Sequence, residues 1–214
     1  QCIVASTASV ADQDKEVIET LVRDKSLTYV FDRGYINYHY YVQWALHMTL
    51  FVARIKANNK LPAVSEKRQV ASNSPVTLDQ DVLCTDPQTG KKARLRLVEY
   101  MCQDKKGKLI RIRVVTNRFD LTAEEISEIY RHRWKIEMLF KWMKQHVHLK
   151  KLYNNKPRAV WNQIYLSLIA YVLCEYMRLK TNKAITKWEL LQLFLHFAEQ
   201  DIAKLIAYLN RPPT

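Results

Sequence analysis

The stretch 121–151 constrains the fold of this chain more than any other part of the sequence. No glycine or proline interrupts it, and Asp120 or Thr122 can serve as the N-cap residue of a helix. Glu124 and Glu125 follow in the first turn, where negative charge stabilises a helix. The sequence therefore predicts one long helix across this stretch.

The predicted helix carries a polar stripe beside an apolar one. At about 100° per residue, four polar residues fall within an arc of about 60°: Tyr130, Arg133, Glu137 and Lys144. The neighbouring arc is apolar and contains Ile129, Ile136, Leu139, Phe140, Met143 and Val147. We expect the apolar arc to pack against a core and the polar stripe to lie at the edge of that core, which suits a site. Spacing alone favours the alternative, a solvated face of ordinary salt bridges.

The polar stripe also forms a sequence motif. The pattern Tyr130-x2-Arg133-x3-Glu137-x6-Lys144 matches, without a gap, the signature that ends the catalytic domain of IS4-type bacterial transposases of the DDE class. The surrounding residues, RWKIEMLFKWMKQH, resemble that family closely, and the resemblance extends over residues 2–173. It implies a ribonuclease-H-like catalytic core with a β-rich insertion, acting on transposon ends as a homodimer with Mg²⁺.

Strand and helix patterns alternate upstream of this motif. Short apolar runs predict strands at 2–5, 27–31 and 50–55, and amphipathic runs predict helices at 12–22 and 37–48. This order is typical of an α/β fold in which helices cover the faces of a sheet. Together with the resemblance, it predicts a ribonuclease-H-like mixed sheet with flanking helices.

Asp32 follows the apolar strand 27–31 directly. Ligand-binding groups collect at strand ends in open sheets, so Asp32 is a candidate site residue. Composition alone allows an equally plausible alternative, in which Asp32 and Gly34 merely form a turn. The resemblance favours the site, because the family carries a D-R-G-Y element at the end of a strand for its second metal-binding Asp.

The helical period disappears between residues 57 and 118. Alternating segments at 95–101 and 109–115 flank the polar loop 103–108, which predicts a β-hairpin. Downstream of the long helix, apolar stripes predict helices at 159–179, 186–197 and 201–209. We therefore predict four parts: a partial core (1–56), a β-rich insertion (57–118), a catalytic helix completing the core (119–151) and a helical C-terminal part (152–214).

Charge indicates a polyanionic partner. Lysine and arginine outnumber aspartate and glutamate 34 to 21. Between residues 131 and 158 the basic residues are opposed by Glu137 alone, which favours double-stranded DNA over a membrane surface. The four cysteines show neither zinc spacing nor a disulfide framework, which favours a reducing cytoplasm. The most apolar run, 164–177, is too short to span a bilayer. We expect a bacterial, cytoplasmic, DNA-associated protein.

The resemblance assigns chemistry to individual residues. Asp32 and Glu137 are the expected catalytic carboxylates and metal ligands, because Mg²⁺, or alternatively Mn²⁺, prefers oxygen ligands and two such ions can activate a nucleophile and stabilise a leaving oxyanion. Arg133 is expected to bind a phosphate through its planar fork. Tyr130, Lys144 and Lys141 are the other expected DNA contacts.

Several tempting residues are given no catalytic role. Trp134 and Trp142 could stack on a flipped base, but helix aromatics more often belong to a core. His146 and His148 point apart on a helix and predict no zinc site. Asp12 and Asp14 do not match the family's first catalytic Asp, which we expect to be missing. The 214-residue chain alone is then expected to be inactive, and the alternative is a remnant that binds DNA or assembles only.

Overall fold

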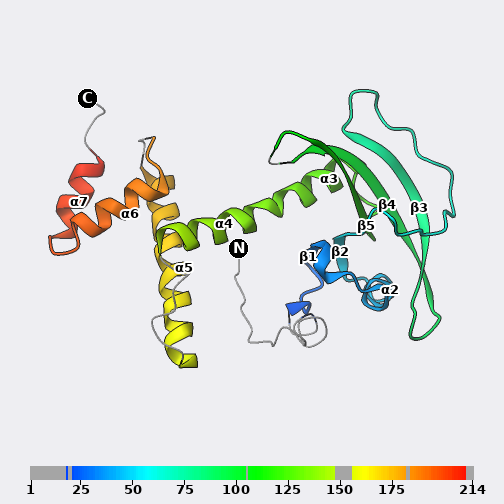
Figure 1. Ribbon diagram of the computed structural model, residues 1–214, viewed down its shortest axis with the longest axis horizontal. Coiled ribbons are helices and arrows are strands. Elements are labelled where there is room, and N and C mark those ends of the chain that lie inside the picture. The colour runs from blue at the N-terminus through cyan, green and yellow to red at the C-terminus, as the bar shows by residue number, and fades with distance from the viewer. Residues whose placement is uncertain (1–17, 19–20, 105, 148–155, 182–183, 211–214) are drawn as a thin grey trace. The chain divides into compact units, whose positions relative to one another are not determined.

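The computed structural model describes residues 18, 21–104, 106–147, 156–181 and 184–210. The predicted strand at 2–5 and most of the predicted helix at 12–22 lie outside these residues. The chain divides into two compact units between Trp134 and Lys135, and each unit is described by itself (Figure 1).

The first unit is built on a five-stranded mixed sheet with the strand order β1-β2-β5-β4-β3. β1 (Thr28–Phe31) runs parallel to β2 (Leu50–Arg54), and every other neighbouring pair is antiparallel. The remaining strands are β3 (Val76–Thr85), β4 (Lys92–Gln103) and β5 (Leu109–Thr116). The predicted hairpin is confirmed as β4–β5. Because β5 pairs with β2, the strands of the region 57–118 extend the same sheet.

Helices cover both faces of this sheet, which confirms the predicted α/β class and is compatible with a ribonuclease-H-like fold. α2 (Tyr38–Leu46) packs on one face, where Phe51 and Ala53 of β2 join its core. α3 (Ala123–His132) packs on the other, where Val52 joins a second core. Alternate residues of β2 therefore point to opposite faces, as the pleat requires.

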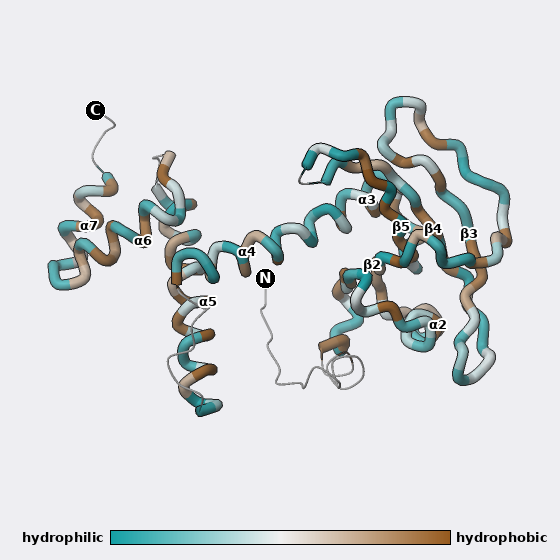
Figure 2. Tube along the Cα trace, viewed as in Figure 1, coloured by the Kyte–Doolittle hydropathy of each residue, from teal (hydrophilic) through white to brown (hydrophobic). Residues whose placement is uncertain are grey.

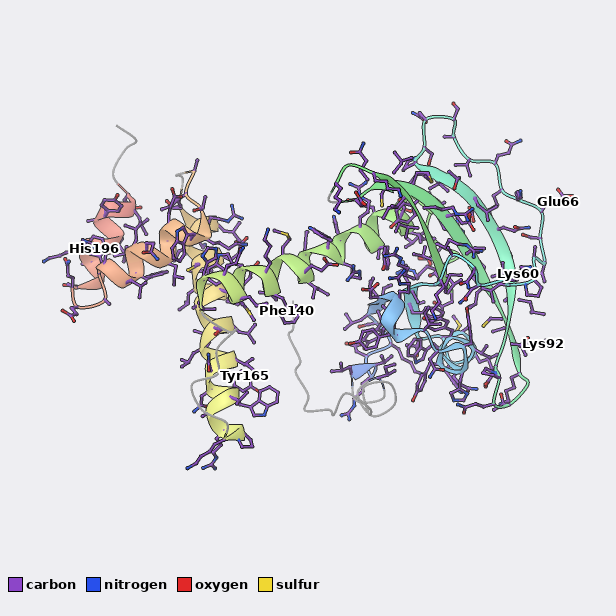
Figure 3. The ribbon with its side chains drawn as sticks, in the orientation of Figure 1. Lys60, Glu66, Lys92, Phe140, Tyr165 and His196 are labelled. Atoms are coloured by element: carbon purple, nitrogen blue, oxygen red, sulfur yellow. The ribbon has the colours of Figure 1, made fainter. Side chains whose placement is uncertain are left out.

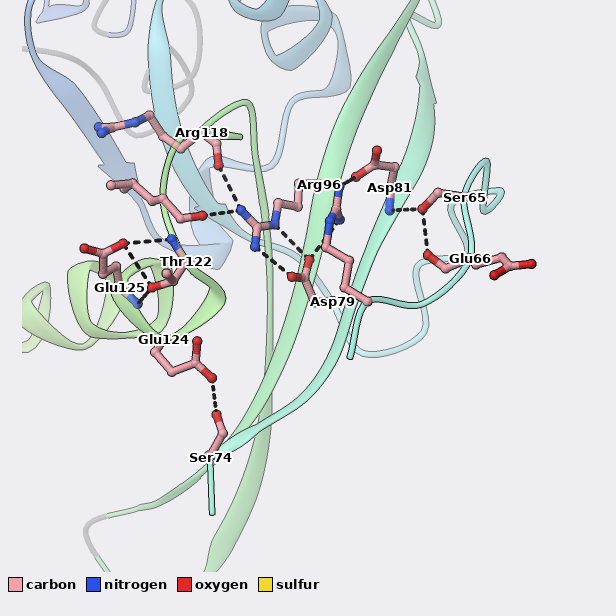
Figure 4. A network of polar contacts seen from close by, with 12 residues as sticks. Ser65, Glu66, Ser74, Asp79, Asp81, Arg96, Arg118, Thr122, Glu124 and Glu125 are labelled. Carbon is pink, nitrogen blue, oxygen red and sulfur yellow. Dashed lines mark hydrogen bonds and ion pairs between the residues drawn. The ribbon is translucent and has the colours of Figure 1, made fainter. Parts of the chain in front are cut away.

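A buried ion pair joins the strands to the start of α3 (Figure 4). The guanidinium of Arg96 on β4 donates to both carboxylate oxygens of Asp79 on β3, at 2.8 and 2.7 Å. It also donates to the carbonyl oxygens of Leu121 and Arg118, just before the helix. Such a bidentate pair is directional as well as strong. Arg96 thus holds the chain entering α3 against the sheet.

The predicted long helix is not continuous. α3 begins at a capping box, in which the Thr122 hydroxyl accepts from the Glu125 amide and the Glu125 carboxylate accepts from the Thr122 amide. It ends at His132, and α4 (Trp134–His146) follows after Arg133. The Arg133 amide donates to the Tyr130 carbonyl at 3.1 Å, a tighter turn than that of an α-helix. The prediction of one uninterrupted helix is therefore wrong at Arg133.

The second unit is helical. α5 (Pro157–Lys180), α6 (Lys187–His196) and α7 (Ile202–Leu209) agree with the three predicted C-terminal helices. Its core contains Trp142, Met143, Cys174, Leu190, Leu205 and Leu209. Apolar residues recur along α5 (Figure 2), yet none of the described helices is both long and apolar enough to cross a membrane.

The apolar arc of the predicted helix is only partly buried. Leu139 and Val147 pack against the core of the second unit and Ile129 against a core of the first. Ile136 and Phe140, by contrast, are 50% and 52% exposed, and Phe140 projects away from α4 (Figure 3). The expectation that the whole arc packs on one core is wrong, because the division of the helix near Arg133 assigns its two parts to different cores.

Candidate functional site

Asp32 lies at the carboxyl end of β1, where the sheet gives way to the short 3-10 helix η1 (Arg33–Tyr35). Its Oδ1 accepts from the Arg33 amide at 2.6 Å, so the carboxylate does cap a turn, as one of the two alternatives proposed. The side chain is 41% exposed and remains accessible to a ligand. Its turn role and a site role are therefore compatible.

Two residues from the junction of α3 and α4 reach this carboxylate. The Tyr130 hydroxyl donates to Asp32 Oδ1 at 3.2 Å, across a separation of 98 residues. Arg133 Nη1 lies 3.3 Å from Asp32 Oδ2, and the guanidinium also lies over the Tyr130 ring at 5.6 Å. Because the Arg133 side chain is only 14% exposed and pairs with a distant strand end, a solvated helix face does not describe it. The structure thus brings together three of the predicted site residues.

These contacts set the ionisation of the site. Burial raises the pKa of Asp32, but the Arg33 amide, the charge of Arg133 and the Tyr130 hydroxyl outweigh it, so the net pKa lies below the ordinary value. Burial, reinforced by the charge of Asp32, raises the pKa of Tyr130. At neutral pH the site therefore holds an ionised carboxylate and a protonated phenol.

Glu137, Lys141 and Lys144 lie on α4, in the second unit. Glu137 is partly buried, and both lysines are exposed. The pairing of Glu137 with Asp32 stays a prediction. In the part of the chain that the structure describes, no group of three or more His, Cys, Asp or Glu residues is arranged to hold a metal ion.

The structure distinguishes the two tryptophans of α4 by their burial. Trp142 is buried in the core of the second unit, as the structural interpretation proposed, and Trp134 is 40% exposed. The His146 ring stacks on the Trp188 ring, with 4.3 Å between the ring centroids, and its centroid lies 5.4 Å from that of Trp142. His148, Asp12 and Asp14 lie outside the described residues.

Sequence reasoning missed Arg54, the last residue of β2. Burial raises the pKa of Asp32, and the charge of Arg54 helps to lower it, with a smaller effect than the Arg33 amide, Arg133 and Tyr130. Strand alternation places Arg54 on the same face as Val52, toward α3. That alternation was readable in the segment LFVARI, but only the strand pairing shows that Asp32 is its neighbour.

The chemistry of Asp32 fits one part of a divalent metal site. Its carboxylate is ionised at neutral pH and accessible, and Mg²⁺ binds such oxygens while retaining water ligands. One carboxylate is an incomplete ligand set. The expected role of Glu137 as a further ligand stays a prediction.

The fold is compatible with what related sequences indicate. Residues 2–173 match the family described as "Transposase DDE domain". That match covers most of the chain, and the chain belongs to this family of insertion-sequence transposases.

Individual relatives support the same assignment. The chain is 30% identical over 203 residues, 94% of its length, to the "Putative transposase y4zB" of Sinorhizobium fredii, covering 56% of that protein. It is 33% identical over 156 residues, 72% of its length, to the "Probable transposase for insertion sequence element IS5377" of Geobacillus stearothermophilus, covering 40% of that protein. The chain therefore spans about half the length of the curated relatives that it matches.

Proposed function

We propose that this chain supplies part of the catalytic domain of a DDE transposase, which cleaves and joins DNA strands at insertion-sequence ends in a metal-dependent reaction. The observation that carries the proposal is the convergence of Tyr130 and Arg133 on Asp32. These residues come from the two sequence elements, strand end and helix motif, that the family pairs. The proposed setting is the bacterial cytoplasm, with a homodimer acting on the DNA.

Asp32 and Glu137 would hold the divalent cations, Mg²⁺ or Mn²⁺. When bound, such cations activate a water or 3′-hydroxyl nucleophile and stabilise the leaving oxyanion. Asp32 supports this role because its low pKa keeps it ionised without a metal. The proposed complete site requires a further carboxylate, which the family brings from the part of the protein upstream of the matched motifs.

Tyr130, Arg133, Lys141 and Lys144 would bind the DNA backbone. Arg133 presents a planar fork suited to two phosphate oxygens, whereas the exposed lysines act as flexible point charges. Tyr130 is neutral and can donate its proton in a hydrogen bond to a phosphate oxygen. Tyr130 and Arg133 contact Asp32, so a phosphate held by these two donors would lie beside this carboxylate.

The first experiment compares DNA binding by matched variants, and it tests the DNA contacts that the catalytic candidate shares with a binding-only one. We expect Arg133→Ala and Lys144→Ala to weaken binding to a labelled insertion-sequence-end duplex and to reduce its salt dependence by about one phosphate contact each. Glu137→Ala should retain or improve binding, because it removes negative charge. Lys204→Ala, which removes an exposed lysine from α7 of the same unit, is the control for Lys144→Ala. Equal binding by all variants would refute the proposal.

A second candidate function is DNA binding or assembly without catalysis. It is favoured by the site in the first unit, where one carboxylate contacts two side chains that can donate hydrogen bonds to a phosphate. We propose that the 214-residue chain alone binds DNA but does not cut it. Nicking or joining of insertion-sequence-end DNA by the purified chain with Mg²⁺, lost on Glu137→Ala, would refute this candidate and support the first.

A further inference from the structure

Arg54 differs from the other partly or fully buried arginines of the described residues because it lacks an ion pair. Six arginines of the described residues are at least partly buried. Five of them form an ion pair with a carboxylate: Arg96, Arg113, Arg118, Arg133 and Arg178. Across the described residues, the Arg54 guanidinium has no carboxylate within 4 Å. Its nitrogens are not among the described buried polar atoms that lack a partner, so the charge stays open to water and to a ligand.

Strand pairing fixes where this charge lies. Val30 of β1 pairs with Val52 of β2 in parallel register, and both belong to the core beneath α3. Two residues further along each strand come Asp32 and Arg54, on the same face and at the same edge. Arg54 also pairs with Val114 of β5 in the antiparallel ladder. The two strand pairings therefore fix the position of the Arg54 backbone at this edge of the sheet.

The charge of Arg54 acts on Asp32 and Tyr130 of the candidate site and on Tyr100 and Cys102 of β4. Burial raises the pKa of Tyr130 and of Tyr100, and in both the charge of Arg54 acts in the opposite direction. The same charge acts on Asp32 without forming an ion pair with it. Arg133 takes that ion pair, at 3.3 Å. Asp32 therefore lies near two guanidiniums, one of which is engaged with it and one of which is not.

We infer that Arg54 is a phosphate-binding residue, and that it holds a backbone phosphate of the DNA strand that lies beside Asp32. A phosphate oxygen supplies the anion that Arg54 lacks, and the planar guanidinium matches two such oxygens. Together with Arg133, which contacts Asp32, Arg54 would present a second guanidinium fork to the same strand. This inference rests on the proposed function, to which it adds a contact outside the Tyr130–Lys144 motif.

Arg111 offers a matched control. It lies on β5 of the same sheet, is 54% exposed, and is 3.6 Å from Glu99. Arg113, two residues along the strand, bonds the same Glu99, so both arginines lie on the face opposite α3. Replacing Arg111 removes the same charge from the protein but not from the candidate site.

The test measures affinity of the full 214-residue chain for a labelled DNA duplex between about 50 and 200 mM salt. We expect Arg54→Ala to weaken binding about tenfold and to lower the slope of log affinity against log salt by about 0.9, the value for one phosphate. Arg54→Lys should recover only part of the affinity, because it restores the charge without the fork. Arg111→Ala should leave both quantities unchanged.

The outcomes separate this inference from the proposed function. If Arg133→Ala weakens binding but Arg54→Ala matches wild type in affinity and slope, the inference is wrong and the proposed function stands. Equal losses in Arg54→Ala and Arg111→Ala would reduce the effect to net charge and also overturn it. Failure of the wild-type chain to bind DNA would refute the proposed function itself. Urea unfolding of each variant identifies any loss caused by misfolding, and Arg54→Lys then carries the comparison.

Discussion

Replacing Arg96 by methionine tests how the sheet holds the helix that carries Tyr130. The side chains of Arg96 and Asp79 are 6% and 5% exposed, so the substitution leaves a buried carboxylate without its bidentate partner. Removing one member of a buried pair typically costs about 3–5 kcal/mol. Arg68 still donates to Asp79 at 3.1 Å, which offsets part of this loss. We therefore expect Arg96→Met to lower the free energy of unfolding by about 3 kcal/mol.

Arg94→Met is the control, because Arg94 lies two residues away on the same strand face. Its side chain is 64% exposed and its nearest carboxylate, that of Asp81, is 3.6 Å away. Exposed pairs of this kind contribute about 0–1 kcal/mol, so this variant should unfold close to wild type in urea. The double variant Arg96→Met with Asp79→Leu should be more stable than Arg96→Met alone, since no unpaired charge then remains. A difference below about 1 kcal/mol between the Arg96 and Arg94 variants would refute the reasoning.

Four further substitutions, one of them a control, test local features of the first unit. Met48 has φ 59° and is 72% exposed, so Met48→Gly should raise the free energy of unfolding by about 1 kcal/mol, and a lower value in urea unfolding would contradict this. Gly107 has φ 76°, and Gly107→Ala should cost about 1 kcal/mol, whereas Gly34→Ala, at a position with open space and no positive φ, should cost nothing measurable by the same assay. The lowered pKa of Asp32 stabilises the fold above the unfolded pKa of about 4, and that contribution is lost as pH falls through the folded pKa. Asp32→Asn should therefore be less stable than wild type at pH 7 by under about 1 kcal/mol, and the difference should shrink at pH 3; a gap that widens on acidification would disprove the sign.

The sequence predicted β1, β2, α2 and the β4–β5 hairpin, because these have strong local signals, but it did not predict β3. Continuous apolar runs marked β1 and β2, and alternation on both sides of a glycine-containing loop marked the β4–β5 hairpin. β3 carries Asp79 and Asp81, whose buried carboxylates break the apolar alternation expected of a strand. Those carboxylates are tolerated only because Arg68 and Arg96 reach them from other segments, which no local pattern reveals.

The division at Arg133 could not be predicted. No glycine or proline marks it, and Arg133 itself keeps helical backbone angles, φ −53° and ψ −30°. The change is confined to one tighter turn, in which its amide bonds the Tyr130 carbonyl. Helix periodicity describes an average over several turns, so a single 3-10 step leaves the polar stripe apparently intact. The same step separates the residues that contact Asp32 from those on α4.

The candidate site thus depends on two features of the sequence: local spacing along a helix, and the register between two strands that are distant in sequence. Residue types and their spacing on one element identified Tyr130 and Arg133, because a helix repeats over a short distance. The position of Arg54 depends on a strand register between β1 and β2, which is set by the pairing of Val30 with Val52 in a shared core. A slip of one residue in that register would turn Arg54 away from Asp32 while leaving every local signal unchanged. The core beneath α3 therefore does more than stabilise the unit: it selects which arginines face the carboxylate.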